Sequence, residues 1–267
     1  MSRIGPTLAR LRDARRTALV PFITAGDPSV EATVPALHAL VGGGADLLEL
    51  GVPFSDPEAD GPAIQAASER ALANGVTLRQ VLELVADFRA RDTATPVILM
   101  GYLNSILAMG ESDFVERAAA AGVDGFIVVN LPPEEAGTLR TAMSARNMDL
   151  IFLAAPTTTD ERLELIDGVA SGFIYHVALK GITGADHIAV SPVAANVARL
   201  RRKTRLPVLV GFGIKNGAMA RAVAEHADGV VVGAALVSRM GEMAGRAGDI
   251  PAMLSGAVGE IRRALDA

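Results

Sequence analysis

Short apolar stretches alternate with longer amphipathic stretches along nearly the whole chain. Eight short apolar runs, rich in residues that favour strands, predict buried strands at residues 19–23, 47–50, 97–100, 126–129, 150–153, 173–177, 208–210 and 230–232. The segments between them carry apolar residues at helical spacing, as in residues 34–41 and 81–88. Strands that read as continuous apolar runs and alternate with helices are typical of a parallel sheet covered by helices.

Eight such units predict an α/β fold, a single (β/α)8 TIM barrel. The alternative is a doubly wound open sheet, but the eight repeats and the lack of an early GxGxxG turn favour the barrel. An extra N-terminal helix over residues 4–15 precedes the first strand and is expected to cap the barrel floor. No Ser-rich, Pro-rich or like-charge linker interrupts the sequence, so residues 1–267 are expected to form one domain.

The composition of the chain argues against several classes of binding partner and cofactor. The formal net charge of −5 gives no overall basic field to attract nucleic acid or anionic lipid. The chain has no cysteine, which excludes disulfides and thiolate chemistry, and its four histidines lack metal-ligand spacing, so no metal is expected. The N-terminus does not read as a secretory signal and no apolar run could span a bilayer, which predicts a cytoplasmic protein.

The candidate catalytic acid is Glu49. In a barrel of this type the active site is built at the carboxyl ends of the strands, and Glu49 is a carboxylate within the leucine-rich run LLELG. Burial raises the pKa of a carboxyl group, which would suit Glu49 to proton transfer near neutral pH. The alternative is a glutamate that pairs structurally with an arginine, and the pattern alone does not separate the two.

The loop that follows, VPFSDPEADGP at residues 52–62, carries three more acids. Asp60 is the second catalytic candidate. The alternative is that Asp56 and Asp60 only form turns or cap the helix that begins near Pro62.

Glycine-rich turns follow the last two predicted strands, at residues 211–217 and 229–235. Loops at these positions of a barrel commonly bind phosphate through backbone N–H groups and a helix N-terminus, although the glycines could simply form tight turns. A third turn, at residues 180–185, has glycines on both sides of a threonine and predicts a mobile lid. Lys180 is a weaker candidate for Schiff-base chemistry, because it lies beyond the strand.

Taken together, these motifs resemble those of the alpha subunit of tryptophan synthase. The likeness covers nearly the whole chain and rests on LVPFITAGDP at 19–28, ELGVPFSDPEADGP at 49–62, APTT at 155–158, KGITG at 180–184 and GFGI at 211–214. The resemblance implies a lyase of L-tryptophan biosynthesis. Such a lyase cleaves indole-3-glycerol phosphate into indole and glyceraldehyde 3-phosphate, with no metal or organic cofactor in this subunit.

The resemblance also implies residue roles. Glu49 would protonate indole carbon 3 and accept the proton of the adjacent glycerol hydroxyl, and Asp60 would stabilise positive charge on the indole nitrogen. Thr183 would bond to Asp60 when the lid closes. The positions expected to bind substrate are Phe22, Met100, Leu153, Tyr175, Thr183, Gly184, Phe212, Gly213, Gly233 and Ala234.

A partner is implied as well: a pyridoxal-phosphate beta subunit that receives indole through a tunnel, in a tetramer of two alpha and two beta chains. The expected interface includes Pro53, Asp56, Glu58 and Asn104. Two other hypotheses remain open, a free-standing lyase and a catalytically weak regulatory subunit of a beta-type enzyme.

Five positions depart from the family pattern. Glu58 replaces an apolar residue, which is expected to raise the pKa of Asp60 or to alter docking of the partner. Ala234 replaces a serine beside the phosphate, and the lost hydroxyl should weaken phosphate binding by about 1 kcal/mol. The remaining departures are Asn130 for aspartate, Ser105 for proline and Ala178 for serine.

Overall fold

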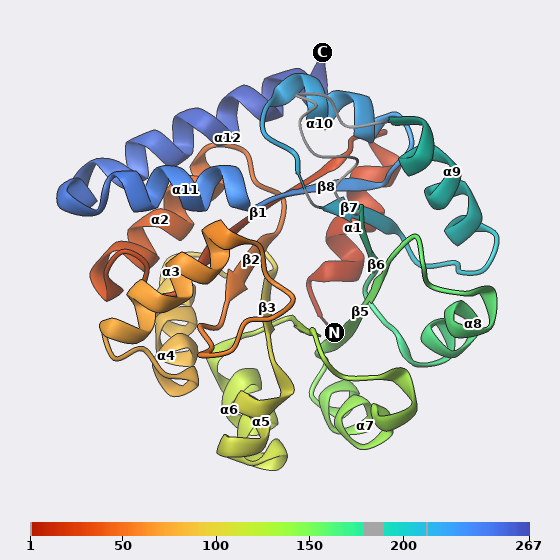
Figure 1. Ribbon diagram of the computed structural model, residues 1–267, viewed down its shortest axis with the longest axis horizontal. Helices are drawn as coiled ribbons and strands as arrows, with labels where there is room; N and C mark the ends of the chain where they lie inside the picture. The colour runs from red at the N-terminus through yellow and green to blue at the C-terminus, as the bar shows by residue number, and fades with distance from the viewer. Residues whose placement is uncertain (1, 179–189, 212) are drawn as a thin grey trace.

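The computed structural model describes residues 2–178, 190–211 and 213–267. Eight parallel strands close into a barrel in chain order (Figure 1). The predicted TIM barrel is confirmed, and all eight predicted strands are present with small shifts at their ends. The strands are β1 (Ala18–Thr24), β2 (Leu48–Gly51), β3 (Val97–Gly101), β4 (Gly125–Val128), β5 (Asp149–Ala154), β6 (Ile174–Val177), β7 (Val208–Gly211) and β8 (Gly229–Val232).

Helices surround the barrel and cover its outer face (Figure 1). None of the helices in the described ranges is long and apolar enough to cross a membrane. They are α1 (Ile4–Asp13), α2 (Val30–Gly42), α3 (Pro62–Ala73), α4 (Leu78–Arg89), α5 (Leu103–Met109), α6 (Glu111–Ala121), α7 (Gly137–Ala145), α8 (Asp160–Val169), α9 (Val190–Arg201), α10 (Gly217–Ala224), α11 (Ala234–Glu242) and α12 (Ile250–Asp266), with 3₁₀ turns η1 (Pro133–Glu135) and η2 (Ala244–Asp249).

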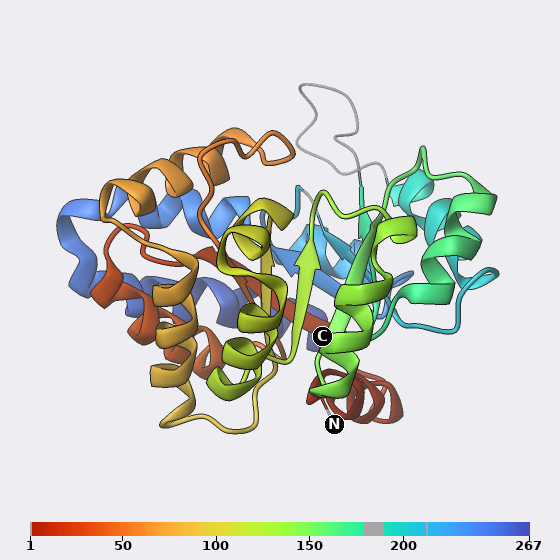
Figure 2. The same cartoon turned by 90° about the horizontal axis from the view of Figure 1, so that it is seen from below.

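The extra N-terminal helix closes one end of the barrel, as the sequence predicts. Ile4, Leu8 and Leu11 of α1 are buried in the cluster formed by inward-facing strand residues, including Val20 and Ile98. Figure 2 shows α1 at one end of the barrel and the loop between β2 and α3 at the other. Any ligand that reaches the barrel interior from the carboxyl ends of the strands therefore enters at the end opposite α1.

The alternation of side chains along β2 aims Glu49 into the barrel. Leu48 and Leu50 belong to the outer core between strands and helices, so the residue between them faces inward. The register pairs Glu49 with Phe22 of β1 and with Ile98 of β3. A carboxyl group is thus held among apolar neighbours inside the barrel.

Candidate active site

A cavity of about 700 Å³ lies at the carboxyl ends of the strands, and both candidate acids, Glu49 and Asp60, line it. Its walls come from β1, β2, β3, β5, β6 and β8 and from the loops that follow β2, β7 and β8. The predicted substrate-binding residues that line it are Phe22, Met100, Leu153, Tyr175, Gly213, Gly233 and Ala234. Lining residues that sequence reasoning missed include Ile64, Val129, Val177, Lys215, Val231 and Arg239.

Three predicted substrate-binding residues, Thr183, Gly184 and Phe212, lie outside the described residues. The predicted lid over residues 180–185 lies outside them too, and so does the expected bond between Thr183 and Asp60.

Glu49 is the most deeply buried acid of this cavity, with 1% of its surface exposed. Burial first, and then the nearby charge of Asp60, together raise its pKa to about 8. No ion pair in the described part of the chain includes Glu49, and its Oε2 atom has no hydrogen-bond partner there. The structure therefore does not support the structural arginine pair, and near neutral pH it leaves a mostly protonated carboxyl group facing the cavity.

Asp60 does not cap α3. Gly61 is the N-cap residue, and no side chain accepts a capping hydrogen bond there. The Asp60 carboxylate instead accepts a hydrogen bond from the Tyr102 hydroxyl, with 3.2 Å between Oδ2 and the phenol oxygen. Burial raises the pKa of Asp60, and the hydrogen bond from Tyr102 opposes that rise. The capping alternative for Asp60 is wrong, and the side chain is available to the cavity.

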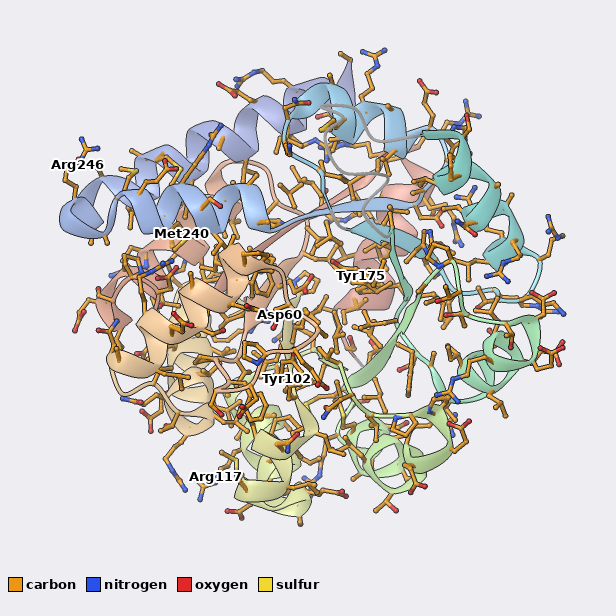
Figure 3. The ribbon with its side chains drawn as sticks, in the orientation of Figure 1. Asp60, Tyr102, Arg117, Tyr175, Met240 and Arg246 are labelled. Atoms are coloured by element: carbon orange, nitrogen blue, oxygen red, sulfur yellow. The ribbon has the colours of Figure 1, made fainter. Side chains whose placement is uncertain are left out.

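Tyr102 is a further candidate site residue, which sequence reasoning missed. Its hydroxyl also accepts a hydrogen bond from the Ala59 N–H over 3.0 Å, and its ring stacks on Phe54 at 4.9 Å between centroids. Burial and the charge of Asp60 hold the pKa of Tyr102 well above its usual range, so it remains a neutral donor. Figure 3 shows Asp60, Tyr102 and Tyr175 near the centre of the barrel viewed end-on. The available signal was a tyrosine directly after a barrel strand.

The charge of Glu58 affects the pKa of Tyr102, and not that of Asp60 as the sequence suggested. Glu58 is exposed, and burial rather than Glu58 is the cause of the raised pKa of Asp60. Glu58 contributes instead to the raised pKa of Tyr102. The expected effect on Asp60 is therefore not found, whereas the expected effect on partner docking stays a prediction.

The proposed interface residues lie at the same end of the barrel as the cavity. Asp56, Glu58 and Asn104 are exposed, and Pro53 is buried. Asn130 joins two of the loops there: its Oδ1 accepts a hydrogen bond from the Leu103 N–H over 2.8 Å, and its Nδ2 donates to Asn104 Oδ1 over 3.1 Å. An aspartate at position 130 could not donate the second bond, because a carboxylate has no N–H, so Asn104 would have to turn its amide and donate instead.

The other end of the cavity is suited to an anion. Helix α11 begins at Ala234 with no side-chain cap, which leaves its first N–H groups available to a negatively charged ligand. Gly213 adopts a left-handed φ of 82° in the loop after β7, a conformation that glycine reaches without strain. Lys215 and Arg239 also line this part of the cavity and add positive charge. Both glycine-rich turns thus meet at one site.

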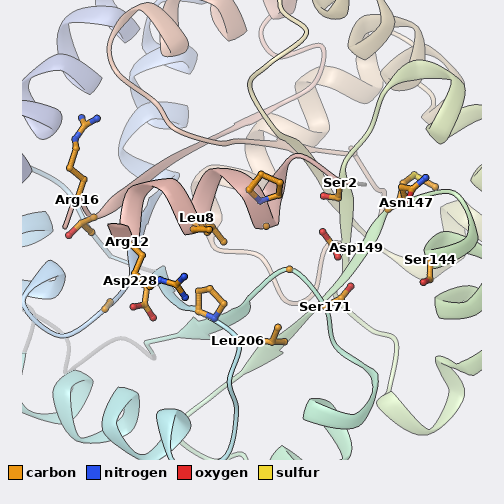
Figure 4. Close-up of a pocket in the computed structure, with 18 of the residues that line it drawn as sticks. Ser2, Leu8, Arg12, Arg16, Ser144, Asn147, Asp149, Ser171, Leu206 and Asp228 are labelled. Carbon is orange, nitrogen blue, oxygen red and sulfur yellow. The ribbon is translucent and has the colours of Figure 1, made fainter. Parts of the chain in front are cut away.

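A second large cavity, of about 750 Å³, lies beside α1 at the barrel floor (Figure 4). Asp228 lines it, but its carboxylate already accepts a hydrogen bond from the Val208 N–H over 2.8 Å and pairs with Arg201 over 2.8 Å. Within the described ranges, no group of three or more potential metal ligands occurs. The cavity at the opposite end remains the candidate active site, because it combines a buried acid with an anion-binding helix end.

Comparisons with known proteins agree with this geometry. The family model described as tryptophan synthase alpha chain matches residues 8–264. The tryptophan synthase alpha chain of Alkalilimnicola ehrlichii is 54% identical over 266 residues, covering 100% of this chain and 97% of the relative, and that of Nitrosococcus oceani is 52% identical, covering 100% and 98%. The crystal structure of tryptophan synthase subunit alpha from Legionella pneumophila superposes with a TM-score of 0.94 at 44% identity, covering 100% of this chain and 99% of that chain.

Proposed function

The chain belongs to the tryptophan synthase alpha chain family, and from this premise we propose that Glu49 and Asp60 are its catalytic residues. It is a lyase of L-tryptophan biosynthesis that cleaves indole-3-glycerol phosphate to indole and glyceraldehyde 3-phosphate. The observation that carries the proposal for the two residues is the pairing of a buried, protonated Glu49 with a tyrosine-bound Asp60 in one cavity.

Glu49 acts first as an acid and then as a base. Its pKa of about 8 leaves it protonated near neutral pH, so it can donate a proton to carbon 3 of the indole ring. The resulting carboxylate then accepts the proton of the hydroxyl group on the adjacent glycerol carbon. As that O–H bond breaks, a carbonyl group forms, the carbon–carbon bond breaks, and its electron pair returns to the ring. Glu49 ends the cycle protonated, as it began.

Asp60 stabilises the charge that this sequence creates. Protonation of carbon 3 places positive charge on the ring nitrogen, and a fixed carboxylate lowers the energy of that intermediate. The hydrogen bond from Tyr102 favours the ionised form of Asp60 and fixes its orientation. Apolar side chains around the two acids, including Phe22, Met100 and Leu153, offer a surface for the indole ring.

The phosphate group would lie at the N-terminus of α11. Backbone N–H groups near Gly213, Gly233 and Ala234 are the proposed donors, and the helix dipole favours the negative charge. The side chains of Lys215 and Arg239 support binding of a dianion at this end of the cavity. The substrate would therefore span the cavity, with its ring near the acids and its phosphate at the helix.

We also infer that the chain functions with a beta subunit. Alpha chains of this family carry no cofactor of their own, and pyridoxal phosphate belongs to the beta chain. The exposed end of the β2–α3 loop and the start of α5, with Asp56, Glu58 and Asn104, are the proposed docking region, in a tetramer of two alpha and two beta chains. A cytoplasmic location fits this biosynthetic role and is part of the proposal.

The decisive measurement is indole release from indole-3-glycerol phosphate by the purified chain, alone and with a tryptophan synthase beta subunit. Glu49→Gln and Asp60→Asn should each abolish release, while the matched surface variants Glu83→Gln and Asp87→Asn on α4 should behave as wild type. Acceleration on adding the beta subunit would support the partnership, and equal rates would favour a free-standing lyase. Wild-type release by Glu49→Gln would overturn the assigned role.

A further inference from the structure

A second, much smaller cavity adjoins the active site beside Asp60. Its volume is about 10 Å³, which suits a single water molecule and nothing larger. Asp60 and Tyr102 line it from one side. Thr24, at the end of β1, and Ser68, on α3, line it as well. The cavity therefore brings two side-chain hydroxyls of separate elements close to the catalytic anion.

Thr24 contributes a buried hydroxyl that has no partner among the described residues. The residue is 1% exposed, and its Oγ1 atom makes no hydrogen bond within the described residues. Thr24 lies two positions after the cavity-lining Phe22, so both side chains leave β1 on the inner face of the barrel. A buried hydroxyl normally has a hydrogen-bond partner, because leaving it unpaired is costly.

Asp60 has the capacity to accept more hydrogen bonds. Its Oδ2 atom accepts one from Tyr102, whereas an ionised carboxylate offers about four acceptor sites in all. A water molecule beside it could donate one proton to the carboxylate and the other to a hydroxyl oxygen. The small cavity thus has both the volume and the polar groups that a structural water needs.

We propose that one water molecule in this cavity joins the Thr24 hydroxyl to the Asp60 carboxylate, which makes Thr24 a positioning residue for the catalytic anion. The catalytic consequence rests on the function proposed above for Asp60, whereas the water site itself does not. Tyr102 holds the carboxylate from the start of α5, and the water holds it from Thr24 on β1. Asp60 is then fixed from two directions before any substrate enters.

The effect of the water bridge on the pKa of Asp60 can be separated from the effects of neighbouring charges. The titratable groups that face Asp60 are Glu49 on β2, Tyr102 at the start of α5 and Tyr175 on β6, with Glu58 in its own loop. The cationic side chains that line the same active-site cavity are Lys215 and Arg239. Changing Thr24 alters none of these charges. A shift in the pKa of Asp60 on removal of the Thr24 hydroxyl would therefore report the hydrogen-bond bridge.

Thr24→Val removes the hydroxyl and keeps the branched shape, and Thr24→Ser keeps the hydroxyl. In Thr24→Val the pKa of Asp60, followed by carboxyl carbon NMR in the free protein, should rise by roughly 0.7, the equivalent of one ordinary hydrogen bond. The turnover number should fall about five-fold at a pH well below the pKa of Asp60, where the carboxyl is mostly protonated, with little change in KM. Thr24→Ser should restore both values.

A high-resolution crystal structure of the wild-type protein tests the water directly, even if Thr24→Val fails to fold. Electron density within hydrogen-bond distance of both Thr24 Oγ1 and the Asp60 carboxylate is the expected result. Its absence, or an unchanged pKa of Asp60 in folded Thr24→Val, would overturn the proposal. If the density and the pKa shift are present but Asp60→Asn still releases indole, the water bridge stands and the proposed role of Asp60 fails.

Discussion

The hydroxyl of Tyr102 donates to the Asp60 carboxylate over 3.2 Å and accepts from the Ala59 N–H over 3.0 Å. One side chain after β3 therefore fixes both the backbone and the acid of the loop after β2. From α3, the Gln65 side-chain amide donates to the Asp60 carbonyl oxygen over 2.9 Å and adds a second restraint on the loop. These contacts of Tyr102 and Gln65 hold the loop and its Asp60 carboxylate in place without any contribution from the substrate.

Tyr102→Phe should remove the hydrogen bond to Asp60 without leaving a cavity in the protein interior. The variant keeps the ring that stacks on Phe54 but loses the donor to Asp60, so the pKa of Asp60 should rise and the turnover number should fall about ten-fold. The loss should be greatest at acidic pH, where the weakened carboxylate becomes protonated. Steady-state rates of indole release between pH 5 and 9 would measure it. A wild-type pH profile in a folded Tyr102→Phe protein would mean that Tyr102 does not tune Asp60.

The buried carboxyl of Glu49 should make folding stability depend on pH. Its pKa is about 8 in the folded protein against an ordinary value of 4.5, so the folded state binds more protons than the unfolded state between these values. Stability is therefore lost as the pH rises from 4.5 to about 8, by about 1.4 kcal/mol for each unit of pKa difference. Below pH 4.5 the group contributes no such penalty.

Glu49→Gln mimics the protonated acid and should remove this dependence. Denaturant unfolding should give nearly equal stabilities for wild type and variant at pH 4, and a variant more stable by several kcal/mol at pH 9. Glu83→Gln, on the exposed face of α4, is the matched control and should follow the wild type throughout. Parallel curves for wild type and Glu49→Gln would contradict a raised pKa for Glu49.

The strands and Glu49 could be predicted from the sequence for one physical reason. Barrel strands are buried on both faces, so they read as uninterrupted apolar runs, and a carboxyl group within such a run stands out by its desolvation cost. Tyr102 and Thr24 carry no such signal, because a tyrosine or threonine beside a strand reads as ordinary core. The contact of Tyr102 with Asp60 also spans 42 positions of the chain, which no local pattern encodes. That residues 1–267 form one domain stays a prediction.

Ala234→Ser should strengthen anion binding at α11. The serine hydroxyl would add one hydrogen bond at the helix N-terminus, worth about 1 kcal/mol, or roughly five-fold in the dissociation constant. Calorimetric titration with glycerol 3-phosphate would measure it. Ala244→Ser, exposed in η2, is the matched control and should bind as the wild type does. Equal affinities for wild type and Ala234→Ser would show that the phosphate does not approach this position.

Gly211 at the end of β7 leaves the space that the Tyr175 ring occupies. A Cβ atom at position 211 would lie 2.1 Å from the Tyr175 hydroxyl oxygen and 2.5 Å from its Cζ atom, distances that no real contact tolerates. Tyr175 lines the active-site cavity, so displacement of its ring by the added methyl group would alter the space for substrate. Gly211→Ala should therefore raise KM and lower the turnover number for indole-3-glycerol phosphate.

Two comparisons separate this effect from general damage. Gly137→Ala introduces a methyl group with no atom within 4 Å and should leave activity unchanged. Adding Tyr175→Phe to Gly211→Ala removes the closest clashing atom, so the double variant should recover part of the activity lost in Gly211→Ala, measured against Tyr175→Phe alone. Recovery would identify ring displacement as the cause. If Gly211→Ala has wild-type kinetics, the backbone at the end of β7 shifts to relieve the clash. The Tyr175 ring then keeps its position, and the proposed displacement is wrong.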